Sequence, residues 1–470
     1  MNSRFEDTIV APATIPGTGA ISIIRISGPE CFSVVDAVVS LKSGTVSDSG
    51  GYTIHLGDVE GLDDVLVSVF RAPHSYTGED SVEISCHASL YIVSELIRRL
   101  VAAGCRIAGP GEFTQRAFLN GKMDLAQAEA VADLISSSTE AAHRIALHQL
   151  KGGYSSELAN LRNELLEMTS LLELELDFSE EDVEFADRSR LLSLVDSTRA
   201  HLERLIDSFR LGNAIKNGVP VAIIGPANAG KSTLLNSMLG EERAIVSDIA
   251  GTTRDTIEER LNLDGVLFRF IDTAGIRETS EAVERMGIER TFKALDDAEI
   301  VLAVVDASLK EFDLLEQIQA LLKRVDEERQ KEVLCLNKVD LLDEIDVNKK
   351  VIDINKFVTA VGCKYDLISM SASSGLGVAD LRSLLVSFVK ESVRDEDSTF
   401  VTNLRHYESL QRCLSALSDA RVSLTSSLPA DLVAEDLRRS VSFLNQILGD
   451  DLIDPETVLR NIFSKHCIGK

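Results

Sequence analysis

The chain has 470 residues, of which 44% are hydrophobic and 26% are charged. At about 150 residues per domain, this length predicts roughly three globular domains, each able to bury a core. The 48 Lys and Arg residues against 75 Asp and Glu residues give a net charge of −27. So acidic a surface disfavours binding of nucleic acid or of an anionic membrane by the chain as a whole.

Cysteine usage and hydropathy indicate a reducing compartment. The 7 cysteines are scattered and include no Cys-x-x-Cys pair, so neither a disulfide framework nor a zinc site is expected. The opening residues MNSRFED lack the basic start and apolar core of a signal peptide. No apolar stretch approaches the ~20 residues of a membrane helix. We therefore expect a cytoplasmic protein with no membrane contact.

Residues 1–118 have the pattern of an α+β domain. β-branched, partly alternating residues predict strands, and an amphipathic segment that ends at Gly104 predicts a helix. The predicted strands are Ala20–Ser27, Asp64–Phe70 and Ser81–Cys86, and the predicted helix is Ser89–Ala103.

Two further segments, 119–215 and 386–470, have helical periodicity. Apolar residues recur there every three or four positions, which indicates one buried face on each long helix. These residues are Leu158, Leu161, Leu165, Met168, Leu172 and Leu176, then Leu202, Leu205, Ile206 and Phe209, and finally Leu437, Val441, Leu444 and Leu448.

Between the helical segments, residues 216–385 alternate short apolar strands with helices, which predicts a mostly parallel sheet covered on both faces. Because the ends of a domain usually lie close together, such a domain can be inserted within a helical one. The predicted strands are Val219–Ile224, Leu267–Ile271, Ile300–Val305, Val333–Leu336 and Leu367–Met370.

Residues 225–232, GPANAGKS, fit the phosphate-binding pattern G-x-x-x-x-G-K-S directly after the first of these strands. Glycines let successive backbone N–H groups surround phosphate at a helix N-terminus. Lys231 is expected to reach the β- and γ-phosphates, and the Ser232 hydroxyl to bind Mg²⁺.

Four further motifs follow in the order typical of GTPases. They are GTTRD at 251–255, DTAG at 272–275, NKVD at 337–340 and SAS at 371–373. Asp340 can accept hydrogen bonds from both N1–H and the exocyclic amine of guanine, a pair that adenine does not present. We therefore predict a P-loop GTPase domain inserted in an all-α domain and preceded by an α+β domain. The expected GTP-binding residues are Asn228, Ala229, Gly230, Lys231, Ser232, Thr233, Ser247, Asp248, Ile249, Ala250, Gly251, Thr252, Thr253, Asp272, Thr273, Ala274, Gly275, Asn337, Lys338, Asp340, Ser371, Ala372 and Ser373.

Two positions depart from the Ras-like pattern. Ile276 follows DTAG, where Ras-like proteins carry the glutamine that orients water, so hydrolysis needs another water-positioning group. Asn228 brings an amide oxygen into the P-loop; the alternative interpretation is a tolerated surface residue. For Mg²⁺ we expect Thr253 to join Ser232.

The whole chain resembles the MnmE (TrmE) family of tRNA-modification GTPases. The resemblance covers DTIVAPATIPGTGAISIIRISG, SYTGED, PGEFTQRAFLNGKMDLAQAEAVADLI, the GTPase motifs and the C-terminal FSKHCIGK. It implies a folate-binding and dimerisation domain at 1–118, a helical domain at 119–215 and 386–470 that ends in CIGK, and a G domain at 216–385.

The resemblance also implies a catalytic set of Lys231, Asn228 and Glu284. In this family a K⁺ ion replaces an arginine finger, and the matching residues here are Asn228, Ser247, Ile249 and Thr252. Glu284 matches the residue that orients water. From its own sequence context alone, Glu284 is more often a solvated helix carboxylate; the missing glutamine and the resemblance reverse that interpretation.

For the folate, 5-formyl-tetrahydrofolate or a related tetrahydrofolate, the resemblance implies contacts with Arg25, Glu83, Lys122 and Lys470. Arg25, Glu83 and Lys122 each have the alternative of a surface charge. Cys467 is directed toward the same pocket as a possible tRNA-modification residue.

The expected function is that of a K⁺-dependent GTPase that modifies carbon 5 of the wobble uridine in certain tRNAs with an aminomethyl or carboxymethylaminomethyl group. The resemblance implies a homodimer that acts with an FAD-containing partner (MnmG, also called GidA) in a heterotetramer. The alternatives are a ribosome-assembly GTPase without one-carbon chemistry and a folate-dependent transferase whose G domain is only regulatory.

Overall fold

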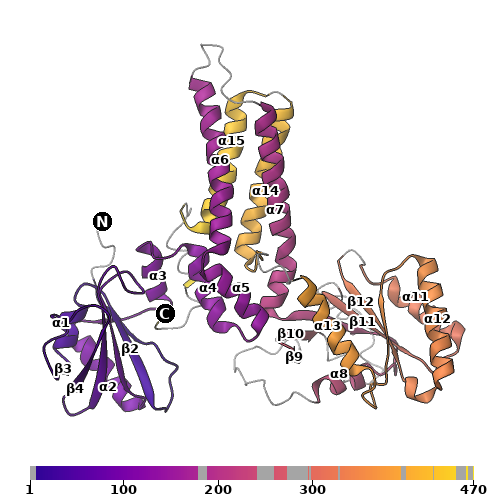
Figure 1. The fold of residues 1–470 in the computed structure, drawn as a ribbon, viewed down its shortest axis with the longest axis horizontal. Coiled ribbons are helices and arrows are strands. Elements are labelled where there is room, and N and C mark those ends of the chain that lie inside the picture. Colours follow the sequence, from indigo (N-terminus) through magenta and orange to yellow (C-terminus); the bar gives the residue numbers. More distant parts are fainter. Residues whose placement is uncertain are drawn as a thin grey trace, which may run out of the picture. The chain divides into compact units, whose positions relative to one another are not determined.

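The structure is a computed structural model. It describes residues 7–177, 188–240, 259–271, 295, 298–326, 329–392, 399–426, 428–450, 462–463 and 469. These residues form two compact units. One consists of Met1–Ser136, Ala146–Leu202 and Glu408–Lys470, and the other of Ser137–Ile145 and Glu203–Tyr407. The predicted multidomain class, with a mixed α/β part, a helical part and a P-loop domain, is confirmed (Figure 1).

A seven-stranded sheet forms the N-terminal part of the first unit, in the order β3-β4-β5-β6-β2-β1-β7. Its predicted strands are present, each extended or shortened by one residue, and Leu90–Ala102 forms the predicted helix, α2. The strands that the sequence analysis missed are short or interrupted by polar residues. The described strands are β1 (Ile9–Pro12), β2 (Ile21–Ser27), β3 (Ser40–Leu41), β4 (Thr53–Val59), β5 (Asp63–Phe70), β6 (Ser81–His87) and β7 (Arg106–Ile107).

The two faces of this sheet differ. One face packs against α1 (Cys31–Asp36) and α2, and alternate residues of the strands form its core with them. On the other face Ile54, Leu56 and Leu66 are 68%, 49% and 47% exposed. Because a strand directs successive side chains to opposite faces, this alternation leaves apolar side chains of β4 and β5 that the described residues do not cover.

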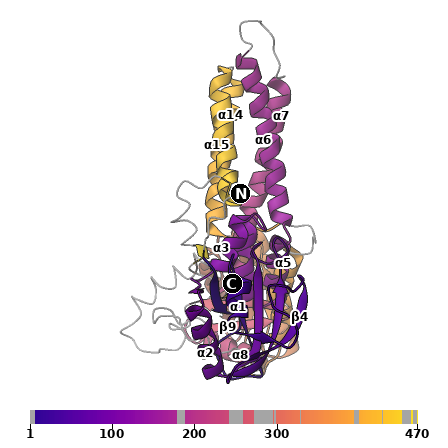
Figure 2. The same ribbon diagram turned by 90° about the vertical axis from the view of Figure 1, so that its left-hand side faces the viewer.

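Helices make up the rest of the first unit and extend into the second. Within the first unit, α6 and α15 run side by side with the parts of α7 and α14 that belong to this unit (Figures 1 and 2). The predicted apolar stripe of α6 is buried from Leu158 to Leu172, and so is that of α15 from Leu437 to Leu448. The helices are α3 (Glu112–Leu119), α4 (Leu125–Ser136), α5 (Glu140–Leu150), α6 (Gly153–Asp177), α7 (Arg188–Asn217), α14 (Leu404–Thr425) and α15 (Ala430–Leu448).

The second unit contains a six-stranded sheet in the order β13-β12-β11-β8-β10-β9. All described pairs are parallel except β9 with β10, so the predicted mostly parallel sheet is confirmed. The sequence analysis missed the edge strand β9, which is part of a hairpin. The strands are β8 (Val219–Ile224), β9 (Glu259–Leu263), β10 (Val266–Ile271), β11 (Ile300–Asp306), β12 (Lys331–Asn337) and β13 (Asp366–Ser369).

Helices cover both faces of this sheet. The helices α11 (Glu311–Leu322) and α12 (Glu344–Val361) pack on one face, and α8 (Lys231–Leu239) and α13 (Val378–Ser392) on the other. Strands buried on both faces are almost entirely apolar, which is why β8 and β11 read as continuous hydrophobic runs. None of the described helices is long and apolar enough to cross a membrane.

Candidate functional site

The carboxyl ends of β8, β11, β12 and β13 meet at one edge of the parallel sheet, where ligands of open α/β sheets bind. The P-loop follows β8 and leads into α8. Two of its glycines are required by the local geometry. Gly225 and Gly230 have φ of +149° and +100°. A Cβ atom at Gly225 would overlap the Val304 carbonyl oxygen, and one at Gly230 would overlap the Asn337 side-chain amide.

Lys231 is the first residue of α8 and folds back over the P-loop. Its Nζ donates to the carbonyl oxygens of Gly225 at 2.9 Å and Pro226 at 2.8 Å. Burial lowers the pKa of Lys231. Asn228 stands at the tip of the loop, exposed and with φ of +61°, a conformation that asparagine tolerates better than most residues. Ser232 and Thr233 follow in the first turn of α8.

Asn337, the last residue of β12, joins the P-loop to the loop after β13. Its Nδ2 donates to the Ala229 carbonyl oxygen at 2.8 Å, and its Oδ1 accepts from the Ala372 backbone N–H at 2.9 Å. The side chain is buried and both ends of its amide are bonded. The structure therefore brings together Ala229, Asn337 and Ala372, which are far apart in the sequence.

The rest of the NKVD and SAS motifs surrounds Asn337. Lys338 has φ of +66° and caps the short 3₁₀ helix Val339–Leu341, which carries the exposed Asp340. The Lys338 Nζ atom forms an ion pair with Asp306 Oδ2 at 2.6 Å. In the loop after β13, the Ser371 and Ser373 hydroxyls hydrogen-bond each other at 3.1 Å.

Several predicted site residues lie outside the described residues. They are Ser247, Asp248, Ile249, Ala250, Gly251, Thr252, Thr253, Asp272, Thr273, Ala274, Gly275, Glu284, Cys467 and Lys470. Within the described part of the chain, no group of three or more His, Cys, Asp or Glu residues could hold a metal ion.

A second site centres on Arg25, on the face of the N-terminal sheet opposite to α1 and α2. Arg25 pairs across the strands with Glu83, and its Nε and NH2 both contact Glu83 Oε1, at 2.9 and 2.8 Å. Arg25 NH1 also donates to the Gly469 carbonyl oxygen at 3.4 Å. The C-terminal end of the chain thus reaches the predicted folate-binding residues.

Aromatic rings complete the surroundings of Arg25. Its guanidinium lies 5.3 Å from the centroid of Tyr76 and 5.8 Å from that of Phe113, distances at which cation–π attraction operates. The Tyr76 hydroxyl bonds Thr114 Oγ1 at 2.8 Å. Burial raises the pKa of Tyr76, against the opposing effects of Thr114 and Arg25.

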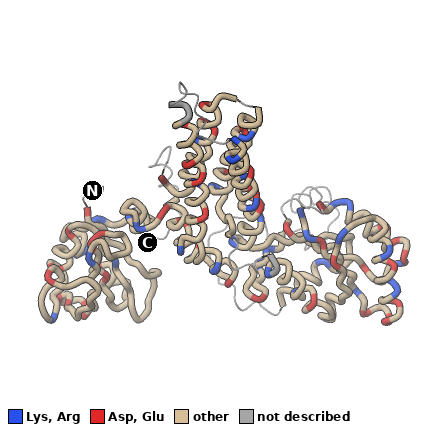
Figure 3. Tube along the Cα trace, turned by 45° about the horizontal axis from the view of Figure 1, so that its top comes forward, with Lys and Arg blue, Asp and Glu red and all other residues tan. Residues whose placement is uncertain are grey.

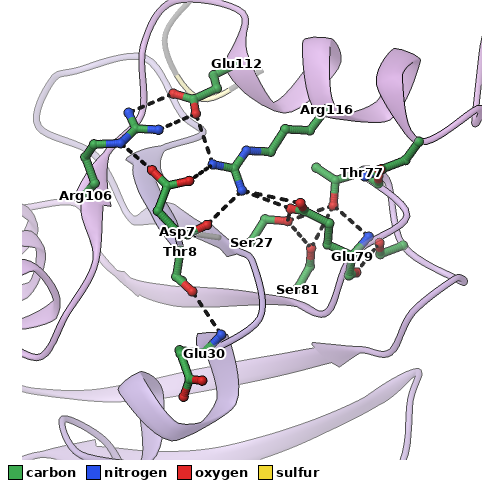
Figure 4. Close-up of polar contacts among 12 residues, drawn as sticks. Asp7, Thr8, Ser27, Glu30, Thr77, Glu79, Ser81, Arg106, Glu112 and Arg116 are labelled. Carbon is green, nitrogen blue, oxygen red and sulfur yellow. Dashed lines mark hydrogen bonds and ion pairs between the residues drawn. The ribbon is translucent and has the colours of Figure 1, made fainter. Parts of the chain in front are cut away.

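Arg116 of α3 holds the surrounding loops in place (Figure 4). It is fully buried. Its NH2 contacts Asp7 Oδ1 at 2.8 Å and Glu112 Oε1 at 3.1 Å, and its NH1 contacts Glu79 Oε2 at 3.3 Å. Arg106 pairs with Asp7 and Glu112 as well. This cluster connects α3 to the loop that carries Tyr76.

Lys122 contacts the same loop at another point. Its Nζ donates to the Pro73 carbonyl oxygen at 2.9 Å, and its aliphatic stem lies against Gly78. Of the predicted folate-binding residues, Arg25 and Glu83 therefore contact each other directly. Lys122 instead contacts the loop that carries Tyr76.

The sequence analysis missed Asp306, Tyr76, Phe113 and Arg116. A carboxylate that ends a buried parallel strand could have indicated Asp306. The Glu112–Arg116 spacing of four residues on an amphipathic helix could have indicated an ion pair. Nothing local marks Tyr76 and Phe113, because their contact with Arg25 arises only from the fold.

Family models match most of the chain. The model of the GTP-binding protein TrmE N-terminus matches residues 8–122, and that of the MnmE helical domain matches residues 125–467. The tRNA modification GTPase MnmE of Bacteroides fragilis (strain YCH46) is 50% identical over 473 residues, which cover 99% of this chain and 100% of that protein.

The tRNA modification GTPase MnmE of Flavobacterium johnsoniae is 49% identical over 478 residues, 99% of each chain. Among solved structures, a single-residue variant of Aquifex aeolicus Era bound to GDP·AlF4⁻ is 25% identical, and the match covers 42% of this chain and 65% of that chain. Its TM-score of 0.29 is too low to carry an argument about fold or function.

Proposed function

Because the chain belongs to the MnmE (TrmE) family of tRNA modification GTPases, we propose that it is a K⁺-dependent GTPase that modifies carbon 5 of the wobble uridine of certain tRNAs. The general activity, GTP hydrolysis in tRNA modification, is the activity of the family. The added group is aminomethyl or carboxymethylaminomethyl. The observation that carries the proposal is the meeting of the P-loop, NKVD and SAS loops through Asn337, in a chain 50% identical to a tRNA modification GTPase.

GTP and Mg²⁺ fit the P-loop edge. The left-handed glycines keep side chains away from the phosphates, and Lys231 has an ammonium beside the loop carbonyls that can turn to the β- and γ-phosphates. Ser232 supplies a hard hydroxyl ligand for Mg²⁺, with Thr253 as its partner. Asp340 and the SAS loop read guanine, and the remaining GTP-binding residues are those predicted above.

K⁺ fits at Asn228, because this amide is exposed at the tip of the loop and its oxygen is the kind of ligand K⁺ takes. Ser247, Ile249 and Thr252 complete the ion's coordination in our proposal. The bound ion supplies positive charge to the transferred phosphoryl group, as an arginine finger does. Glu284 orients the attacking water, since Ile276 cannot.

A tetrahydrofolate, 5-formyl-tetrahydrofolate or a relative, fits beside Arg25. The Arg25–Glu83 pair offers fixed donor and acceptor atoms on an open sheet face, and Tyr76 offers an aromatic surface for a flat ring. Lys122, Lys470 and Cys467 contribute from the neighbouring loop and the C-terminus. Tetrahydrofolate supplies the one-carbon unit of the added group.

A homodimer is supported by the uncovered apolar face of the N-terminal sheet. Ile54, Leu56 and Leu66 are large, exposed and next to each other across β4 and β5, and such patches mark protein interfaces. We further propose a heterotetramer with an FAD-containing partner (MnmG/GidA), a cytoplasmic location, and the division into a folate-binding domain (1–118), a split helical domain (119–215 and 386–470) and a G domain (216–385).

The test is a chromosomal Lys231→Ala replacement followed by mass spectrometry of tRNA nucleosides. Because we propose that Lys231 binds the β- and γ-phosphates, we expect the carbon-5 modification to disappear. Lys349→Ala, an exposed lysine on α12, is the matched control and should leave the nucleosides unchanged. Full modification in the Lys231→Ala strain would favour the transferase with a regulatory G domain. A ribosome-assembly defect with intact nucleosides would favour the assembly GTPase.

A further inference from the structure

At the nucleotide edge, the expected GTP-binding residue Lys338 forms an ion pair with Asp306, a residue that has no part in the function proposed above. Asp306 ends β11 and Lys338 follows the end of β12, and the two strands pair so that Asp306 lies opposite Asn337. The Lys338 Nζ and Asp306 Oδ2 atoms are 2.6 Å apart. The side chains are 31% and 16% exposed, so the pair is largely withdrawn from water.

Asp306 is held rigidly. Its Oδ1 accepts from the Ser308 backbone N–H at 2.8 Å and from the Ser308 hydroxyl at 2.7 Å. Next to it, the Ala307 N–H donates to the Asn337 carbonyl oxygen at 2.8 Å. Burial raises the pKa of Asp306, but hydrogen bonds from Lys338 and Ser308 outweigh that effect, and the pKa of the carboxyl stays below its usual range. The carboxylate is therefore a fixed negative charge.

The backbone around Lys338 is also fixed. Its left-handed conformation turns the chain directly after Asn337, and the next residue, Val339, donates to the Met370 carbonyl oxygen at 3.2 Å. Lys338 thus lies between Asn337, which anchors the P-loop, and Asp340, the expected guanine-reading carboxylate. Its own ammonium is the cation closest in sequence to Asp340.

We propose that Asp306 is a positioning residue for guanine nucleotide binding, which acts by holding the Lys338 ammonium at the end of β11. Two consequences follow. The lysine loses its rotamer freedom before nucleotide arrives, so binding does not have to order it. The ammonium is also kept from pairing with Asp340, which leaves that carboxylate available to guanine while the apolar lysine stem lines the pocket.

The experiment measures dissociation constants of GDP and GTP for the full-length protein by fluorescent nucleotide titration, together with kcat at saturating GTP. Asp306→Asn is expected to weaken both nucleotides about tenfold, equivalent to 1.4 kcal/mol, and to leave kcat within about twofold. Asp313→Asn, an exposed aspartate on α11 with the same charge change, should bind as the parent does.

A double-mutant cycle tests whether Asp306 acts through Lys338. In a Lys338→Met background, which keeps the stem and removes the charge, Asp306→Asn should have less than about twofold further effect. Unchanged affinity in Asp306→Asn, or an equal loss in both backgrounds, overturns the proposal.

If Asp306→Asn does not fold, Asp306→Glu takes its place. Glutamate keeps the negative charge but places it one methylene group farther from the backbone. It should therefore weaken nucleotide binding only when Lys338 is present. An affinity equal to that of the parent, or a loss that persists with Lys338→Met, would again contradict the proposal.

Discussion

Asn228 illustrates how a single residue combines a backbone and a chemical role. It occupies φ of +61° at an exposed tip of the P-loop, where most side chains are strained but asparagine and glycine are tolerated. The local conformation therefore explains an asparagine or a glycine equally well. Only the amide oxygen distinguishes the two, and that atom is the one proposed to bind K⁺.

This difference gives a prediction about the ion. The parent should hydrolyse GTP at least tenfold faster in KCl than in NaCl, because an arginine finger is worth about 10³–10⁵ in rate and the ion recovers part of that. Asn228→Gly keeps the left-handed backbone accessible and removes the ligand, so its rates in the two salts should be nearly equal. Steady-state phosphate release at constant ionic strength measures both.

Asn348→Ala, an exposed asparagine on α12, serves as the control and should keep the preference for K⁺. If the parent itself turns over equally fast in the two salts, no potassium site assists hydrolysis. If Asn228→Gly keeps the preference as well, the ion is bound elsewhere.

At the scale of elements, α3 contacts the N-terminal sheet through buried Phe113 and through a cluster of buried polar groups. Arg116 is fully buried and is bonded to Asp7, Glu79 and Glu112. For Asp7 and Glu112 burial raises the pKa, but hydrogen bonds from Arg106 and the nearby charge of Arg116 bring each pKa below its ordinary value. A carboxyl whose folded pKa is lowered stabilises the fold above its unfolded pKa and loses that contribution as the pH falls through the folded value.

The cluster predicts that removing Arg116 lowers the stability of the fold, and that this loss is smaller at acid pH. Arg116→Met leaves several carboxylates without their buried cation, so it should destabilise the N-terminal unit by about 3–5 kcal/mol at pH 7. Below about pH 4, where ordinary carboxyls take up protons, the difference from the parent should shrink. Scanning calorimetry of the full chain at the two pH values measures it.

Arg98→Met is the matched control, since Arg98 is 68% exposed and pairs with Glu95 along one helix. Exposed pairs of this kind contribute little. Equal transition temperatures for the two variants at pH 7 would mean that the buried cluster does not stabilise the unit.

At the scale of the whole molecule, charge is the dominant feature. The net charge is −27, and both signs of charge occur in each of the two units (Figure 3). No run of Lys and Arg exceeds two residues. Phosphate contacts usually supply most of the non-specific affinity for nucleic acid, so a strongly negative chain is expected to have little of that affinity.

We therefore expect the isolated protein to bind tRNA weakly at physiological salt, with the FAD-containing partner providing most of the phosphate contacts. Filter binding over a series of salt concentrations, with and without the partner, measures this. Tight binding by the isolated protein with a steep salt dependence would contradict the prediction. It would indicate a local basic pocket, built from residues such as Lys122 and Lys470, that the net charge conceals.

Features that depend on contiguous residues were predictable from the amino-acid sequence. The P-loop, NKVD and SAS motifs, the mostly parallel sheet and the apolar stripes of α6 and α15 are all local patterns, because helix and strand periodicity and turn chemistry act over a few residues. Short strands such as β3 and β9 escaped prediction, because tertiary pairing rather than propensity holds them in the sheet.

Contacts between distant parts of the chain could not be predicted in this way and were found in the folded protein. Asp306 meets Lys338 because two parallel strands end at one edge, and Arg25 meets Glu83, Tyr76 and the Gly469 carbonyl because the sheet and the C-terminus converge. Such contacts depend on the order and register of the strands and on where the chain comes back to the sheet. Burial of the whole core sets these features, so no short stretch of sequence indicates them.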